Sequence, residues 1–155
     1  MAHTVFRSDK MHGTENAANL VNVKITEDLD NGSIVVVGAI ATGEREAYTM
    51  SKPTAASALK SVALLAAPEV MYDERLKALS DFYNQSGAIV RGYRLVSDDE
   101  FSLTADGLDG TPAVGSVVEL QAAYKLKVVE SLTSGSTQVG TVIANEGKYW
   151  VIRVD

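Results

Sequence analysis

From residue 20 onward, the chain is a succession of short apolar segments separated by turn residues. Val21, Val23 and Ile25 alternate with polar residues, and this period of two is typical of a strand with one buried face. Residues 33–40 are apolar at almost every position, which predicts a central strand buried on both faces. Many short strands of this kind predict a mainly β protein, a compact β-barrel or β-sandwich. The expected strands cover residues 20–26, 33–40, 45–50, 62–66, 88–95, 100–105, 116–120, 124–129, 139–145 and 148–154.

Two turn sequences indicate how some of these strands are connected. Asn31-Gly32 tolerates the positive φ angles of a tight hairpin turn, so residues 30–32 are expected to join the first two strands as a hairpin. Asn145-Glu146-Gly147 is a second hairpin signal, between the last two strands.

One segment has the periodicity of a helix. Asp73 is a suitable N-cap for residues 74–84, in which Leu76, Leu79 and either Phe82 or Tyr83 fall on one face. The alanine-rich segment 52–60 fits either a short helix or a loop. The sequence therefore predicts one short helix in an otherwise β-rich chain.

Residues 1–19 have neither strand nor helix periodicity, so we expect an extended N-terminal arm followed by a single β-rich domain at 20–155. The arm is neutral, whereas the remainder carries the whole formal charge of −6. Val5 and Phe6 are apolar side chains in an expected tail, and Arg7 and Lys10 lie beside them. These four residues are the predicted contact site for a partner surface.

Reactive groups are few in this sequence. It contains no cysteine, which excludes disulfides, thiolate metal sites and cysteine nucleophiles. His3 and His12 are the only histidines, and both fall in the expected arm, so no Ser-His-Asp triad is predicted. We therefore expect no enzyme activity, no catalytic residue and no cofactor.

An acidic cluster is the most conspicuous charge feature. Its members Asp98, Asp99, Glu100, Asp106 and Asp109 lie within twelve residues that contain no lysine or arginine. Divalent cations bind carboxylate oxygens, but runs of like charge are usually solvated. We expect a solvated acidic edge and no metal site.

Charge and hydropathy also limit the partners. The longest apolar run, residues 62–68, is far shorter than the ~20 residues of a membrane span, and the charged N-terminus is unlike a signal peptide. An oligonucleotide-binding barrel needs a basic groove and aromatic platforms, which a net charge of −6 and 6% aromatic residues do not favour. Neither membrane nor nucleic acid is an expected partner.

Residues 87–94, GAIVRGYR, resemble a segment of the trimeric deoxyuridine triphosphatases. Val90 stands where that family has its catalytic aspartate, and no glycine-rich, arginine-bearing C-terminal arm follows. A nucleotide hydrolase of this type is a distant alternative.

A broader resemblance covers much of the chain. Five segments together are similar to small head proteins of tailed bacteriophages, the capsid decoration or cement proteins: EREAY at 44–48, PEVMYDER at 68–75, RGYRL at 91–95, FSLTADGL at 101–108 and VGSVVEL at 114–120.

This resemblance implies a non-enzymatic structural protein that binds the capsid exterior and stabilises the shell. The implied partners are the major capsid protein and further copies of the chain, as a homo-oligomer with a trimer favoured over a dimer. The implied location is the virion, after synthesis in the bacterial host cytoplasm. Val5, Phe6, Arg7 and Lys10 then become the candidate capsid contacts. A tail or adaptor component of the same architecture is the alternative.

Overall fold

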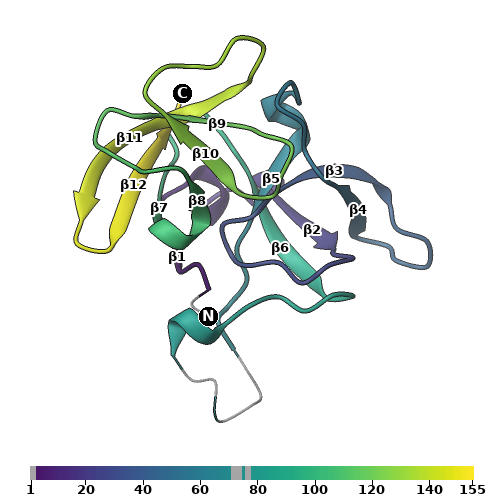
Figure 1. The fold of residues 1–155 in the computed structure, drawn as a ribbon. Helices are drawn as coiled ribbons and strands as arrows, with labels where there is room; N and C mark the ends of the chain where they lie inside the picture. The colour runs from purple at the N-terminus through teal and green to yellow at the C-terminus, as the bar shows by residue number, and fades with distance from the viewer. Residues whose placement is uncertain (1–2, 71–74, 76–77) are drawn as a thin grey trace.

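The computed structural model describes residues 3–70, 75 and 78–155, and its architecture is mainly β, as predicted. The strands form two sheets that lie side by side (Figure 1). One is a closed five-stranded barrel in the order β2 (Leu20–Lys24), β4 (Ala47–Ser51), β3 (Ile34–Ile40), β5 (Val62–Leu65) and β6 (Ile89–Arg94). The other is an open seven-stranded sheet in the order β1 (Phe6–Lys10), β7 (Glu100–Thr104), β12 (Tyr149–Val154), β11 (Gln138–Glu146), β9 (Val117–Glu119), β10 (Leu126–Val129) and β8 (Leu108–Asp109).

The barrel is filled by the alternating apolar residues of its strands. Gly92 lies inside it, where a Cβ atom would be 3.1 Å from Ala63 and 3.2 Å from Val21, so a larger residue would crowd the interior. The interior cluster contains Val21, Val23, Ile25, Leu29, Val35, Ala63, Leu65 and Val90. The period of two in the sequence therefore identifies the inner face of the barrel.

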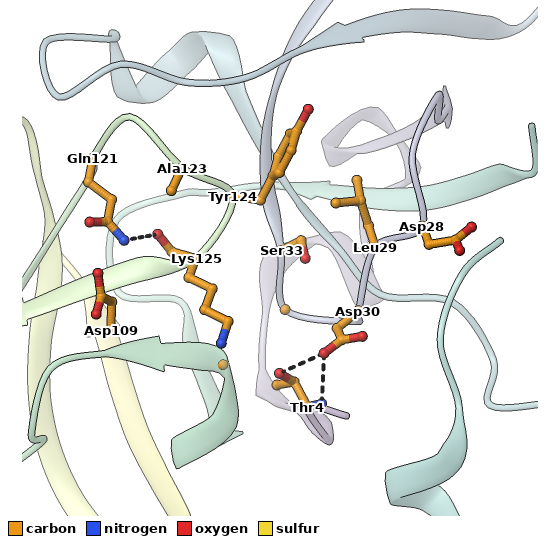
Figure 2. Close-up of a pocket in the computed structure, with 12 residues that line it drawn as sticks. Thr4, Asp28, Leu29, Asp30, Ser33, Asp109, Gln121, Ala123, Tyr124 and Lys125 are labelled. Carbon is orange, nitrogen blue, oxygen red and sulfur yellow. Dashed lines mark hydrogen bonds between the residues drawn. The ribbon is translucent and has the colours of Figure 1, made fainter. Parts of the chain in front are cut away.

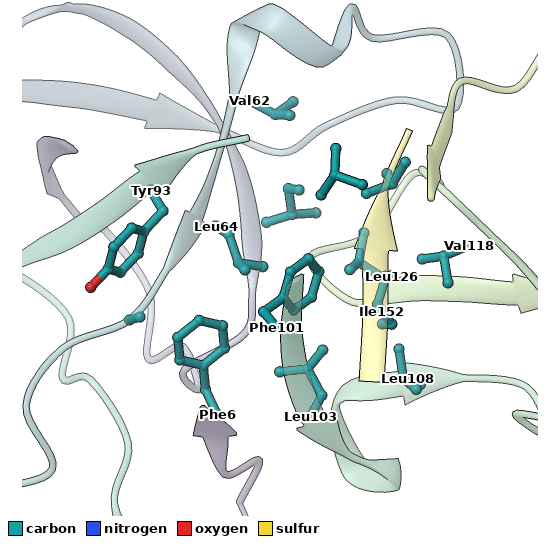
Figure 3. Close-up of a cluster of buried hydrophobic side chains, with 14 of the residues drawn as sticks. Phe6, Val62, Leu64, Tyr93, Phe101, Leu103, Leu108, Val118, Leu126 and Ile152 are labelled. Carbon is teal, nitrogen blue, oxygen red and sulfur yellow. The ribbon is translucent and has the colours of Figure 1, made fainter. Parts of the chain in front are cut away.

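The opposite faces of the same strands form the main core between the barrel and the open sheet (Figure 3). Ile34, Leu64 and Tyr93 pack there against residues of the sheet such as Phe101 and Ile152. β5 is buried at all four of its positions, as is expected for a strand with a core on both sides. β3 is buried only at its start; its pairing with β5 ends at Val36, and residues 38–40, where β3 continues beside β4, are exposed.

The turn at residues 30–33 forms as predicted but does not make a hairpin. Gly32 has φ +86°, and the Ser33 N–H donates to the Asp30 carbonyl at 3.2 Å. However, β2 pairs with β4 and β6 rather than with β3, so the expected hairpin is wrong.

The Asn31 side chain fixes this turn from inside the protein. Its Oδ1 atom accepts hydrogen bonds from Ala67 N at 2.9 Å and from Asn84 Nδ2 at 3.0 Å. Its Nδ2 atom donates to the Ala67 carbonyl at 2.9 Å, and the Gly32 N–H donates to the Leu65 carbonyl at 2.7 Å. Asn31 and Asn84 are buried, so the bond between their amides is shielded from water, while the bonds to Ala67 are partly buried.

The predicted hairpin between the last two strands is confirmed. β11 and β12 pair from Gly140 with Val154 to Glu146 with Tyr149, and Gly147 in the turn has φ +69°.

The predicted helix at 74–84 is wrong where the structure describes it; Asp73, Glu74 and Leu76 lie outside the described residues. Ala78 and Phe82 have extended ψ angles of 149° and 135°, on either side of a single 3-10 turn, η4 (Leu79–Asp81). Asn84 then pairs with Leu29 across an isolated bridge. This pairing with a distant segment overrides the local helical periodicity.

The other described helices are also single 3-10 turns. They are η1 (His12–Thr14), η2 (Ala17–Asn19), η3 (Leu59–Ser61) and η5 (Ala105–Gly107). In segment 52–60, the loop alternative therefore holds until η3 begins.

The N-terminal residues do not form a separate arm. β1 pairs antiparallel with β7, with Phe6 opposite Leu103 and Arg7 opposite Ser102. Val5, Phe6 and Met11 are buried. The expected boundary between residues 19 and 20 is therefore wrong, because residues 6–10 belong to the same sheet as the C-terminal strands (Figure 1).

Candidate interaction surfaces

Two of the four predicted contact residues belong to the core. Phe6 is 8% exposed, and its ring centroid lies 6.2 Å from that of Tyr93 and 6.0 Å from that of Phe101 (Figure 3). Val5 is buried beside it. The prediction that these side chains are exposed anchors is wrong, since both are covered by the protein's own sheet.

Arg7 is held by the chain itself. Its Nη2 atom lies 2.7 Å from Glu146 Oε2, and its guanidinium carbon lies 4.1 Å from the centroid of the Tyr149 ring. The hydrogen bond to Glu146 raises the pKa of Arg7 above its usual value. Lys10, at the end of β1, is exposed. The structure therefore does not bring the four residues together as one surface.

Both histidines make side-chain pairs with aspartates. His3 Nδ1 lies 2.6 Å from Asp30 Oδ1, and the His3 ring stacks on Tyr83 at a centroid distance of 4.9 Å. His12 Nδ1 lies 2.5 Å from Asp99 Oδ1. These pairs hold both ends of the N-terminal segment, which we define as residues 3–12.

Asp99 corrects the expectation of a fully solvated acidic cluster. It is 0% exposed, and it also accepts hydrogen bonds from the backbone N–H groups of His12 and Val96, each at 2.9 Å. Asp98, Asp106 and Asp109 are exposed, as expected. No sequence signal marked Asp99, because its partner His12 is 87 positions away.

Two cavities have several charged or polar residues in their lining. One, of about 590 Å³, lies beside His12 and is lined also by Asp9, Glu15, Asp98 and Arg153. Among residues 3–70, 75 and 78–155, no group of three or more histidines and carboxylates is arranged to hold a metal ion.

The second of these cavities, of about 500 Å³, lies between the barrel and the open sheet (Figure 2). Figure 2 shows Asp30 turned toward Thr4, whose N–H and hydroxyl donate to Asp30 Oδ2 at 3.2 and 3.4 Å. Asp30 is thus occupied by the N-terminal segment on one side of this cavity.

A third cavity, of about 540 Å³, opens at one end of the barrel. It is lined by Lys24, Ile25, Thr26, Ala41, Thr49, Met50, Ser86 and Gly87. Ile40 precedes Ala41 and is 56% exposed, while Ile89 is the cross-strand partner of Lys24 and is 51% exposed. We call this cavity, with Ile40 and Ile89, the barrel mouth. Its lining includes Ala41, at the start of the β3–β4 connection, and Figure 1 shows this connection on the side of the barrel away from the open sheet.

Other functional hypotheses gain little from the geometry. Val90, at the position of the hydrolase aspartate, is buried in the barrel interior. Across the described residues, no helix has the length and apolar character needed to cross a membrane.

The sequence was also compared with known proteins. It matches no model of a protein family, and it matches no curated protein.

Proposed function

We propose that this chain is a structural protein of a tailed bacteriophage that binds the outside of the capsid and stabilises it. The proposed partners are the major capsid protein and further copies of the chain, in a homo-oligomer with a trimer favoured over a dimer. The sequence similarity to capsid decoration proteins motivates this proposal. The observation that supports it best is the barrel mouth.

The barrel mouth has the character of a contact surface. Ile40 and Ile89 each expose more than half of their surface, and their neighbours Ala41 (next to Ile40 in the chain) and Lys24 (paired with Ile89) line a largely apolar cavity together with Ile25 and Met50. Exposed apolar surface that forms a patch is typical of an interaction site. Full burial of an isoleucine side chain stabilises by about 1.5–3 kcal/mol, so covering the exposed halves of both contributes about 2 kcal/mol per copy. We propose this surface as the capsid contact in place of Val5 and Phe6.

The test is binding to undecorated capsids of the phage that encodes the chain. Purified protein is expected to co-sediment with these capsids and to raise the temperature at which they release DNA. The double variant Ile40→Ser/Ile89→Ser should bind about 30-fold more weakly, which is the equivalent of about 2 kcal/mol.

The matched control is Leu132→Ser, because Leu132 is 43% exposed but lies in the loop after β10 rather than on the barrel. Failure of the unaltered protein to bind capsids would contradict the proposed function. Unchanged binding of the Ile40/Ile89 variant would contradict the proposed surface. Light scattering at micromolar concentration would show whether the protein is an oligomer, for which closed cyclic symmetry is the common arrangement.

A further inference from the structure

Residues 3–7 of the N-terminal segment make hydrogen bonds to residues at least 26 positions away in the chain. The Val5 N–H donates to Thr104 Oγ1 at 3.1 Å, and the Thr104 N–H donates to the Val5 carbonyl at 3.1 Å. His3 and His12 pair with aspartates 27 and 87 positions away. The segment thus behaves as an extended peptide docked along the edge of the open sheet, outside β7.

The site that receives this segment, formed by β7 with residues of β6, β11 and β12, matches the sequence of the segment. The rings of Phe101 and Tyr93 receive Phe6, while Glu146 and Tyr149 receive the positive charge of Arg7. An occupant must therefore be an extended strand with an apolar side chain followed by a base. Residues 5–7 of this chain, from the same copy or from another, meet these requirements.

The connection between the N-terminal segment and the barrel allows the segment to come from the same copy or from another copy. Residues 14–18 are all exposed, and the two 3-10 turns between Met11 and Leu20 are closed by local hydrogen bonds such as Thr14 N to Met11 O at 3.1 Å. If these turns open, the seven residues 13–19 span up to about 23 Å. The contacts that the segment makes with β7 are the same in both cases, so exchange between identical copies retains them.

We propose that, in the oligomer, the N-terminal segment of each copy occupies the β7 edge of a neighbouring copy. The partner at this surface is a second copy of the chain. This inference depends on the oligomer proposed above but not on capsid binding.

Cysteine cross-linking tests the exchange directly, because the natural chain has no cysteine. Lys10 on β1 is the antiparallel partner of Glu100 on β7, and such partners have Cα separations suited to a disulfide. The variant Lys10→Cys/Glu100→Cys is expected to give chains linked to one another after oxidation. On a non-reducing denaturing gel, these run at two or three times the mass of 16.5 kDa.

The matched control is Thr141→Cys/Arg153→Cys, which joins partners within the β11–β12 hairpin. Strands of one hairpin stay together, so this variant should give only links within one chain. In a second experiment, Lys10→Cys chains and Glu100→Cys chains are unfolded and refolded together. Exchange predicts a disulfide between the two kinds of chain.

Each outcome decides the inference. If light scattering finds an oligomer but the Lys10/Glu100 variant forms links only within chains, the exchange is wrong and the proposed oligomer stands. If the protein is a monomer, both are wrong. Absence of any disulfide would place β1 away from β7 in every copy and would also overturn the exchange.

Discussion

The substitution Phe6→Ala tests whether the N-terminal residues form a docked strand or a frayed tail. Phe6 is 8% exposed and packs between the rings of Tyr93 and Phe101, which are themselves buried. Removing its ring leaves a cavity that these rigid neighbours cannot close, and buried phenylalanine-to-alanine changes cost about 3–5 kcal/mol. Domains have total free energies of unfolding of about 5–15 kcal/mol, so Phe6→Ala is expected to remove a large part of this stability.

Urea denaturation measures this loss. Trp150 is the only tryptophan and packs partly buried against the main core, so its fluorescence reports unfolding. With a slope of about 2 kcal/mol per molar urea, the midpoint should fall by about 2 M. The melting temperature should fall by about 6–20 °C.

The matched control for this substitution is Lys10→Ala, on the same strand. Because Lys10 is exposed, its removal should change the free energy of unfolding by less than about 0.5 kcal/mol. If Phe6→Ala cost less than about 1 kcal/mol, the docked position of β1 and the correction of the predicted arm would both be refuted.

Three further perturbations test other parts of the structure. Gly140→Ala should prevent stable folding, because the new Cβ would lie 2.1 Å from the Arg153 carbonyl oxygen in the paired strand; circular dichroism and yield of soluble protein measure this. Burial, followed by the hydrogen bond to Glu27, raises the pKa of Tyr124 from 10.0 to about 12. An absorbance titration should therefore find that Tyr124 ionises late, and the stability that this phenol contributes should be complete below pH 10 and lost as the pH rises toward 12. Glu119→Ala should lower the free energy of unfolding by about 1–3 kcal/mol and speed proteolysis of the loop after β10. The reason is that the buried Glu119 carboxylate accepts hydrogen bonds from the backbone N–H and the hydroxyl of Thr133 in that loop.

Local sequence pattern predicted the strands that have at least one continuous buried face. β2, β5, β6 and β12 alternate or are fully apolar, and their positions agree with the structure to within a few residues. β1 was missed because only its first residue is buried and the rest of this edge strand is charged or polar. β8 was missed because it has only two residues.

Closure of the barrel and burial of individual polar groups could not be predicted in this way. Closure depends on the parallel pairing of β2 with β4 and on the pairing of β2 with β6, both between segments separated in sequence. Asp99 looked like one of several solvated carboxylates, and only the tertiary structure brings His12 to it. The barrel mouth was likewise not predicted: Ile40 ends the segment 33–40, which was expected to be buried on both faces, and nothing in the strand expected at 88–95 marked Ile89 as exposed.

The hydrogen bonds of Asn31 have a consequence for the chemical ageing of the protein. In a flexible chain, the nitrogen that follows an asparagine attacks the side-chain amide, and a glycine in that position favours the resulting deamidation because it offers little steric resistance. Here the Gly32 nitrogen is bonded to the Leu65 carbonyl and the amide of Asn31 is held by Ala67 and Asn84, so the two reacting groups cannot approach. The Asn31 side chain should therefore keep its amide through long storage of the folded protein. It should deamidate only in chains that have unfolded.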